Sequence, residues 1–157
     1  MKAASINELK QELNLVAPGK LLELCLRLAK YKKDNKELIT YMLFEAHDET
    51  GYIAGIKKEM EEQFEDVNKT NLYFAKKTLR KILRNTNKYI RYAGSKQVEA
   101  ELLLHYCNCL VRTGINFRKN TTLTNLYQGQ LKKIAKVIST MHGDLQYDYE
   151  KELKQLL

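Results

Sequence analysis

Hydrophobic residues recur every three or four positions along almost the whole chain, which is the spacing of one face of an α-helix. Proline occurs once and glycine seven times in 157 residues. Because these two residues usually mark turns, so few of them favour long helices over many short strands. We therefore expect an all-α protein of about seven antiparallel helices, arranged as a compact bundle or as a short HEAT-like stack of helical hairpins.

The N-terminal part of the chain carries clear helix signals. Ser5 followed by Glu8 is a capping-box pattern, and Pro18 suits the first turn of a second helix that reaches about residue 33. Asp34 or Asn35 can cap a third helix. Its apolar face is wide, which indicates burial against more than one neighbour. That face contains Leu38, Ile39, Met42, Leu43 and Ala46.

The later helices are marked by apolar spacing and by end signals. We expect an apolar face from Ile53 to Val67, a basic helix from about Val67 to Tyr92 that Gly94 stops, and a helix that Ser95 caps. A further helix opens at Thr121 or Thr122 and ends at Gly143, and Asp144 caps the last one. No linker interrupts this series, so the sequence predicts a single all-helical domain over 1–157.

Positive charge is concentrated in the middle of the chain. The net charge is +8, and residues 67–143 contain fifteen Lys and Arg but only two Glu. At 100° per residue, one face of the basic helix contains Tyr73, Lys77, Arg80, Arg84, Lys88 and Arg91, with Lys96 just beyond its end. The opposite face contains Leu79, Ile82, Leu83 and Ile90, which we expect to be buried.

Three interpretations of this charged face remain open. It is a solvated helix face, or it is neutralised by the acidic residues 59–66 of the preceding helix, or it binds a polyanion. In an antiparallel hairpin the acidic residues would reach only the first turns of the basic helix. The candidate polyanion-binding residues are therefore Arg80, Arg84, Lys88, Arg91 and Lys96. No known nucleic-acid-binding motif accompanies them.

The sequence offers little catalytic or metal-binding chemistry. It has no phosphate-binding loop and no metalloprotease or hydrolase motif. The dyad His47-Asp48 resembles the HD pair of all-helical metal-dependent phosphohydrolases, but no histidine precedes it, and Asp48 is more simply a helix cap. Glu101, His105 and Cys109 follow at i, i+4 and i+8, and we expect a polar helix face with a Glu101–His105 hydrogen bond. We expect no metal and no cofactor.

Three functions from different classes follow, in order of preference. The first is a non-enzymatic helical interaction module, a scaffold or adaptor that binds a protein partner. The second is a nucleic-acid-binding accessory protein that uses the basic ridge, and the third is a small metal-dependent phosphohydrolase at His47-Asp48. Three cysteines without a disulfide pattern and the lack of any long apolar run predict a cytoplasmic protein with no membrane segment.

Overall fold

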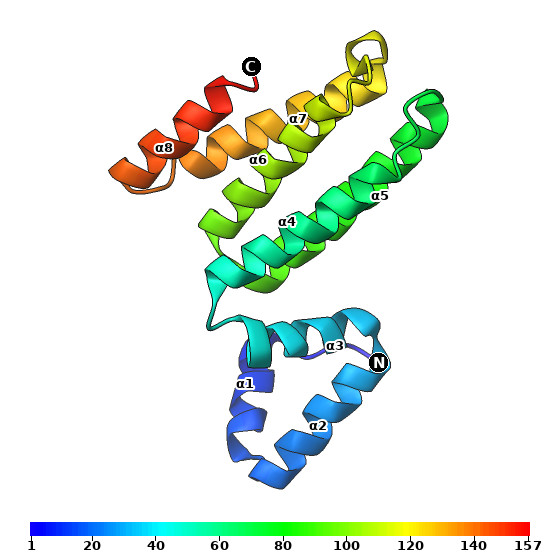
Figure 1. Ribbon diagram of the computed structural model, residues 1–157. Helices are drawn as coiled ribbons and strands as arrows, with labels where there is room; N and C mark the ends of the chain where they lie inside the picture. The colour runs from blue at the N-terminus through cyan, green and yellow to red at the C-terminus, as the bar shows by residue number, and fades with distance from the viewer. The chain divides into compact units, whose positions relative to one another are not determined.

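The computed structural model describes all 157 residues and confirms the all-α prediction. It contains eight α-helices, one π-helical segment and one short 3-10 helix, and no strand (Figure 1).

The chain forms two compact units, Met1–Phe44 and Glu45–Leu157, which we call unit 1 and unit 2. A single domain over 1–157 stays a prediction. No helix combines the length and the apolar character that crossing a bilayer requires.

Unit 1 contains α1 (Ile6–Leu15), α2 (Pro18–Tyr31) and α3 (Lys33–Thr40). The predicted capping box is confirmed, since Ser5 and Glu8 bond reciprocally at the start of α1. Pro18 occupies the first turn of α2, as expected. The predicted cap at Asp34 or Asn35 is wrong, because α3 already begins at Lys33 and has no side-chain cap. Asn35 instead donates a hydrogen bond to the carbonyl of Leu28, which holds α3 against α2.

The third predicted helix does not continue as an α-helix to Ala46. Its last turn is the π-helical segment η1 (Tyr41–Glu45), and the boundary between the two units lies inside it. A π-turn inserts one residue per turn, so it rotates the side chains that follow out of the α-helical stripe. The wide apolar face that the sequence predicts is therefore interrupted at Tyr41.

No residue of unit 1 is buried. The expectation that the apolar face of the third helix is buried against several neighbours is wrong, since Met42 and Leu43 are 63% and 67% exposed. The physical reason is size. Three helices of 8 to 14 residues cannot enclose a core, because the fraction of surface that a chain buries falls steeply in short chains.

Unit 2 contains the longer helices and the hydrophobic core. In chain order they are α4 (Glu49–Glu65), α5 (Leu72–Ala93), α6 (Lys96–Arg112), η2 (Phe117–Lys119), α7 (Thr121–Ile138) and α8 (Gly143–Lys154). Helix α6 packs against α4, α5, α7 and α8, and nine of its residues are buried. It is therefore the central element of the unit, around which the other helices are arranged (Figure 1).

Local hydrogen bonds explain where the helices of unit 2 begin and end. The basic helix begins at Leu72 and not near Val67, because the side chain of Asn68 accepts bonds from the backbone amides of Thr70 and Asn71 and holds this segment in a turn. Gly94 ends α5 in the left-handed conformation, at φ +62°, as predicted. Gly143 opens α8 and His142 is the residue before it. The predictions that Gly143 ends the preceding helix and that Asp144 caps the last one are therefore wrong.

Two tyrosines anchor the core of unit 2. The hydroxyl of Tyr106 on α6 is completely buried and donates to the carbonyl of Leu79 on α5 at 3.0 Å. The hydroxyl of Tyr127 on α7 donates to the carbonyl of Leu156 at 2.8 Å. Each ring contributes apolar area while its hydroxyl remains paired. Tyr106 thus joins α6 to α5, and Tyr127 joins α7 to the segment after α8, without an unsatisfied buried hydroxyl.

Candidate functional site

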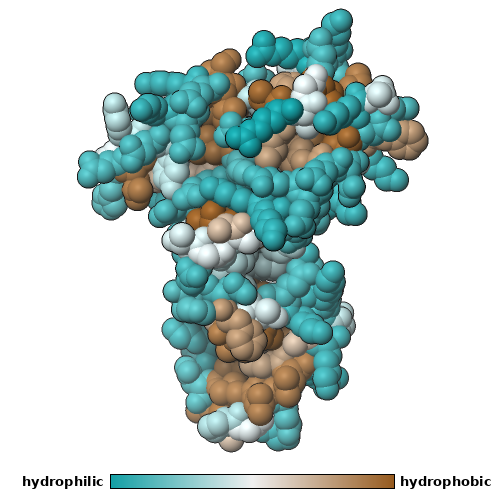
Figure 2. All heavy atoms as spheres, viewed as in Figure 1, coloured by the Kyte–Doolittle hydropathy of each residue, from teal (hydrophilic) through white to brown (hydrophobic).

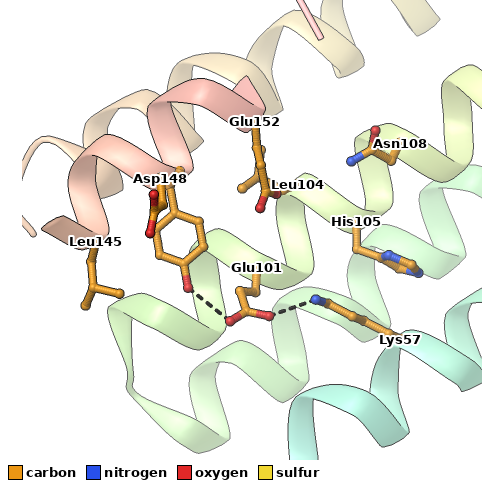
Figure 3. Close-up of a pocket in the computed structure, with 9 residues that line it drawn as sticks. Lys57, Glu101, Leu104, His105, Asn108, Leu145, Asp148 and Glu152 are labelled. Carbon is orange, nitrogen blue, oxygen red and sulfur yellow. Dashed lines mark hydrogen bonds and ion pairs between the residues drawn. The ribbon is translucent and has the colours of Figure 1, made fainter. Parts of the chain in front are cut away.

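A polar pocket of about 290 Å³ lies between α4, α6 and α8. Lys57 reaches it from α4, and Asp148, Tyr149 and Glu152 reach it from α8. The floor is formed by α6, whose Glu101, Leu104, His105 and Asn108 line the cavity. Figure 3 shows the acidic side chains of α8 and Glu101 turned toward the same space. The pocket exists because α6 contacts α4 on one side and α8 on the other.

Glu101 is the most extensively bonded carboxylate of this pocket. Its Oε2 pairs with Lys57 Nζ at 2.7 Å, and its Oε1 accepts from Tyr149 Oη at 3.0 Å (Figure 3). Gln97, one turn earlier on α6, adds a longer bond of 3.4 Å. The Lys57 and Glu101 side chains are only 31% and 23% exposed, so a half-buried ion pair links α4 to α6, and the Tyr149 hydrogen bond adds α8.

These partners fix the charge of Glu101. Burial alone would raise the pKa of this carboxyl, but the hydrogen bond and charge of Lys57 and the hydrogen bonds from Tyr149 and Gln97 outweigh burial and lower it. Burial and the Glu101 carboxylate in turn raise the pKa of Tyr149. Glu101 therefore stays ionised at neutral pH.

A second cluster lies beside the pocket, on the α4 side of His105. One ligand atom each from Glu61, His105 and Cys109 lies within 4.8 Å of the others, and Glu61 Oε1 is 3.1 Å from His105 Nε2. His105 and Cys109 are one turn apart on α6, and Glu61 comes from α4. The predicted Glu101–His105 hydrogen bond is wrong, because Glu101 turns to Lys57 and Tyr149 and leaves His105 to face Glu61.

Burial controls the protonation of this second cluster. It lowers the pKa of His105, the Glu61 carboxylate opposes the shift, and Lys57 and Arg112 reinforce it. Burial also raises the pKa of the Cys109 thiol to about 11, helped by Glu61 and opposed by Arg112. At neutral pH the imidazole is therefore uncharged and the free thiol is protonated.

Most residues of α5 are exposed or buried as the sequence predicts. Arg80, Arg84 and Arg91 are exposed, whereas Leu79, Ile82 and Ile90 are buried. Two residues differ from the prediction, since Leu83 and Lys88 are both half-buried. Lys88 also engages the ring of Tyr89 at 5.5 Å. Lys96 lies in the first turn of α6 and donates to the carbonyl of Thr140 at 3.3 Å.

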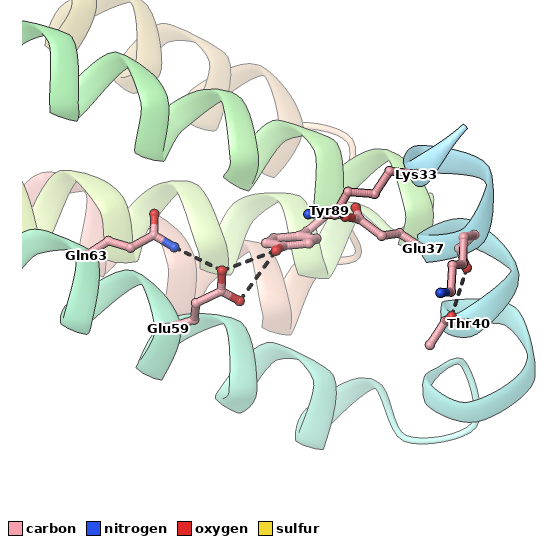
Figure 4. Close-up of polar contacts among 7 residues, drawn as sticks. Lys33, Glu37, Thr40, Glu59, Gln63 and Tyr89 are labelled. Carbon is pink, nitrogen blue, oxygen red and sulfur yellow. Dashed lines mark hydrogen bonds and ion pairs between the residues drawn. The ribbon is translucent and has the colours of Figure 1, made fainter. Parts of the chain in front are cut away.

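The acidic residues of α4 do not neutralise the start of α5 as the hairpin argument suggested. Within unit 2, Glu59 accepts from Gln63 at 2.9 Å and from the Tyr89 hydroxyl at 3.2 Å (Figure 4). Glu61 faces His105 instead. The ion pairs within unit 2 join Lys57 to Glu101 and Lys133 to Glu99, and they include none of Arg80, Arg84 and Arg91.

The His47-Asp48 dyad lies at the start of α4. Asp48 is the N-cap of this helix and accepts from the amide of Gly51 at 2.9 Å, which confirms the predicted capping role. His47 is exposed beside it. The two side chains therefore lie at the start of a helix.

The sequence indicated two of the three residues of the second cluster. The helical spacing of His105 and Cys109 was visible, but their partner Glu61 is 44 positions before His105. Lys57 and Glu61 are also one turn apart, so one face of α4 carries both residues that meet α6.

Comparison with protein families, curated proteins and solved structures finds no match to this chain.

Proposed function

We propose that this chain is a non-enzymatic helical interaction module that binds a protein partner through unit 1. One observation carries the proposal. Twelve large hydrophobic side chains between Ile6 and Phe44 are exposed, whereas the longer unit 2 exposes seven. Figure 2 shows hydrophobic side chains gathered over the surface of unit 1. Contiguous apolar surface on a helical unit is typical of an interaction site, because water contact with it is unfavourable.

The charges around this surface favour an acidic partner. Residues 1–44 contain eight Lys and Arg against five Asp and Glu. A second copy of the chain would bring the same positive excess to the interface, and like charges raise the free energy of association. An amphipathic helix with a hydrophobic face and acidic flanks complements both the apolar residues and the charge. We take such a helix, presented by another protein, as the occupant.

Helix α2 offers the best-defined part of the proposed surface. Leu22 and Leu26 are one turn apart and are 61% and 50% exposed. The same helix carries Arg27 and Lys30, which can pair with acidic flanks of a bound helix. Leucine anchors with a cationic rim are what an acidic amphipathic helix requires.

The test uses a synthetic probe. A fluorescent amphipathic peptide with a leucine face and glutamate flanks should bind the full chain, and its affinity should fall as salt is raised. The double variant Leu22→Ser, Leu26→Ser should weaken binding about tenfold or more, because loss of two interface anchors costs at least about 1.4 kcal/mol. Tyr147→Ser, which removes a 70% exposed side chain from unit 2, is the matched control and should bind normally.

Three results would contradict the proposal. The first is equal binding of the peptide by wild type and the leucine variant. The second is a stable dimer in analytical ultracentrifugation that the leucine variant abolishes, since the occupant would then be a second copy. The third is binding to phosphatidylserine vesicles but not to the peptide, because basic amphipathic helices also bind anionic membranes.

A second candidate function is supported by the exposed cations of α5. Arg80, Arg84 and Arg91 lie on one helix face, are exposed, and take part in none of the ion pairs of unit 2. Cations without carboxylate partners are available to phosphates. A nucleic-acid-binding accessory role would use these three arginines. Lys88 and Lys96 have other contacts and would contribute less.

Salt dependence measures this second function. If wild type binds labelled DNA or RNA, the variant Arg80→Ala, Arg84→Ala, Arg91→Ala should flatten the slope of log affinity against log salt by about 2–3, at roughly 0.7–0.9 per phosphate contact. Alanine at Lys10, Lys30 and Lys32 removes the same charge from unit 1 and should leave the slope nearly unchanged. Equal slopes for the two triple variants would show that only net charge matters.

A cytoplasmic location is part of the proposal. Cys25, Cys107 and Cys109 are free thiols, which is typical of proteins from a reducing compartment.

A further inference from the structure

We propose that Glu61, His105 and Cys109 form a binding site for a zinc ion or a divalent cation of similar ligand preference. The proposal is independent of partner binding by unit 1, because all three residues belong to unit 2. Carboxylate oxygen, imidazole nitrogen and thiolate sulfur are the three ligand types that zinc uses in proteins. Two come from α6 and one from α4, so a bound ion would link two helices that already pack together.

The spacing of the ligand atoms is close to what such a site requires. Tetrahedral zinc with bonds of about 2.0–2.3 Å places its ligand atoms roughly 3.3–3.6 Å apart. Glu61 Oε1 and His105 Nε2 are 3.1 Å apart, and all three ligand atoms lie within 4.8 Å of one another. Glu61 is 53% exposed, so its side chain has room to adjust its position around a bound ion.

His105 supplies the second, independent observation. Its Nε2 is buried and forms no hydrogen bond, although Glu61 is near, because the two groups are not aligned for one. A buried polar atom without a partner is rare in folded proteins and requires an explanation. A metal ion at this position would supply the missing partner for Nε2.

The local charges also fit a divalent cation. Lys57 and Arg112 act on His105, so an added cation would be repelled if its ligands were neutral. Glu61 and an ionised Cys109 carry two negative charges, which balance a zinc ion. The occupied site then has no net charge, so Lys57 and Arg112 do not repel it.

Protonation changes when the ion binds. The lowered pKa of His105 keeps its imidazole neutral, which is the form that ligates metals. The Cys109 thiol is protonated when free, because burial raises its pKa to about 11. A coordinating thiol is deprotonated by the metal, so binding releases this proton to solvent.

The three protein ligands leave one position of a tetrahedral site for water or another small ligand. His105 and Cys109 close the site on the protein side, with Cys109 only 6% exposed, whereas Glu61 is largely at the surface. Three protein ligands with one open position are the arrangement of reactive zinc sites, and four protein ligands that of structural ones. The inferred ion would thus be reachable from solvent past Glu61.

Cobalt is the probe, because it replaces zinc and reports on its ligands by absorption. Titration of the full-length chain with Co²⁺ should produce a sulfur-to-cobalt charge-transfer band that saturates at one ion per chain. Cys109→Ser should abolish the band. Cys25→Ser removes the exposed thiol of unit 1 and should leave it unchanged. Zinc added afterwards should displace cobalt and remove the band.

A second pair of variants does not disturb the core. Glu61→Gln keeps the size of the side chain and should weaken zinc affinity, measured by competition with a chelating dye, at least about tenfold. Glu62→Gln, one residue along on exposed surface, should bind zinc like wild type. The proposal is overturned if wild type gives no charge-transfer band, if the band survives in Cys109→Ser, or if the two glutamine variants bind zinc equally.

Discussion

Leu79→Ala is expected to lower the free energy of unfolding by about 2–5 kcal/mol, which is the usual range for a buried leucine that leaves a cavity. Leu79 is completely buried on α5, and its carbonyl accepts the hydroxyl of Tyr106 from the central helix. The cavity would open where α5 and α6 meet, and a close-packed interior closes such space only partly. The measurement is urea unfolding followed by circular dichroism.

Arg80→Ala is the control for Leu79→Ala because it changes the next residue of the same helix. Arg80 is exposed and takes part in none of the ion pairs of unit 2, so its truncation should change stability by less than about 0.5 kcal/mol. A similar loss in both variants would mean that the buried and exposed faces of α5 are assigned incorrectly.

Lys57→Met is expected to destabilise the protein by about 1 kcal/mol at neutral pH. Methionine keeps most of the aliphatic stem but leaves Glu101 without its cation. Hydrogen bonds to charged groups contribute about 1.5–3 kcal/mol, and we use a smaller value because both side chains keep some solvent contact. Lys58→Met is the matched control, since Lys58 is exposed and adjacent. Equal losses would show that the ion pair with Glu101 adds nothing.

The same variant should alter the response to acid. The folded-state pKa of Glu101 lies below the ordinary glutamate value of 4.5, so the unfolded chain takes up this proton first as pH falls. The contribution of the lowered Glu101 pKa to the free energy of unfolding is therefore fully present above pH 4.5. It is lost as the pH falls through the lower pKa of the folded state. Lys57→Met removes one cause of the lowered pKa. The stability difference between wild type and variant should shrink from pH 7 to pH 4.

Local signals in the sequence were sufficient for much of the fold. Ser5, Gly94 and Ser95 act on residues within one turn, so their roles as caps or stops can be predicted without tertiary information. The start of α5 was missed because the Asn68 turn competes with helix formation, and apolar spacing alone does not reveal this. The last turn of the third helix was missed for a similar reason, since a π-turn has no simple sequence signal.

The candidate sites were harder to predict, because they depend on which helices pack together. Glu101 and His105 share a face of α6, and an isolated helix would pair them. In the folded protein, two residues of α4 contact them instead. Lys57 pairs with Glu101 and Glu61 faces His105, so the two residues belong to separate clusters. The basic face of α5 was predictable because amphipathicity belongs to one helix. The exposure of Met42 and Leu43 could not be predicted, because apolar spacing indicates burial whatever the size of the unit.

The central position of α6 has a consequence for how the protein is made. Helix α6 packs against two helices that precede it in the chain and two that follow it. During synthesis, α7 and α8 emerge from the ribosome after α6. The side of α6 that they cover therefore stays exposed to water until both helices have emerged. Over that interval the nascent chain exposes core leucines of α6 as well as the hydrophobic residues of unit 1. Transiently exposed apolar surface of this kind makes a nascent chain prone to aggregation.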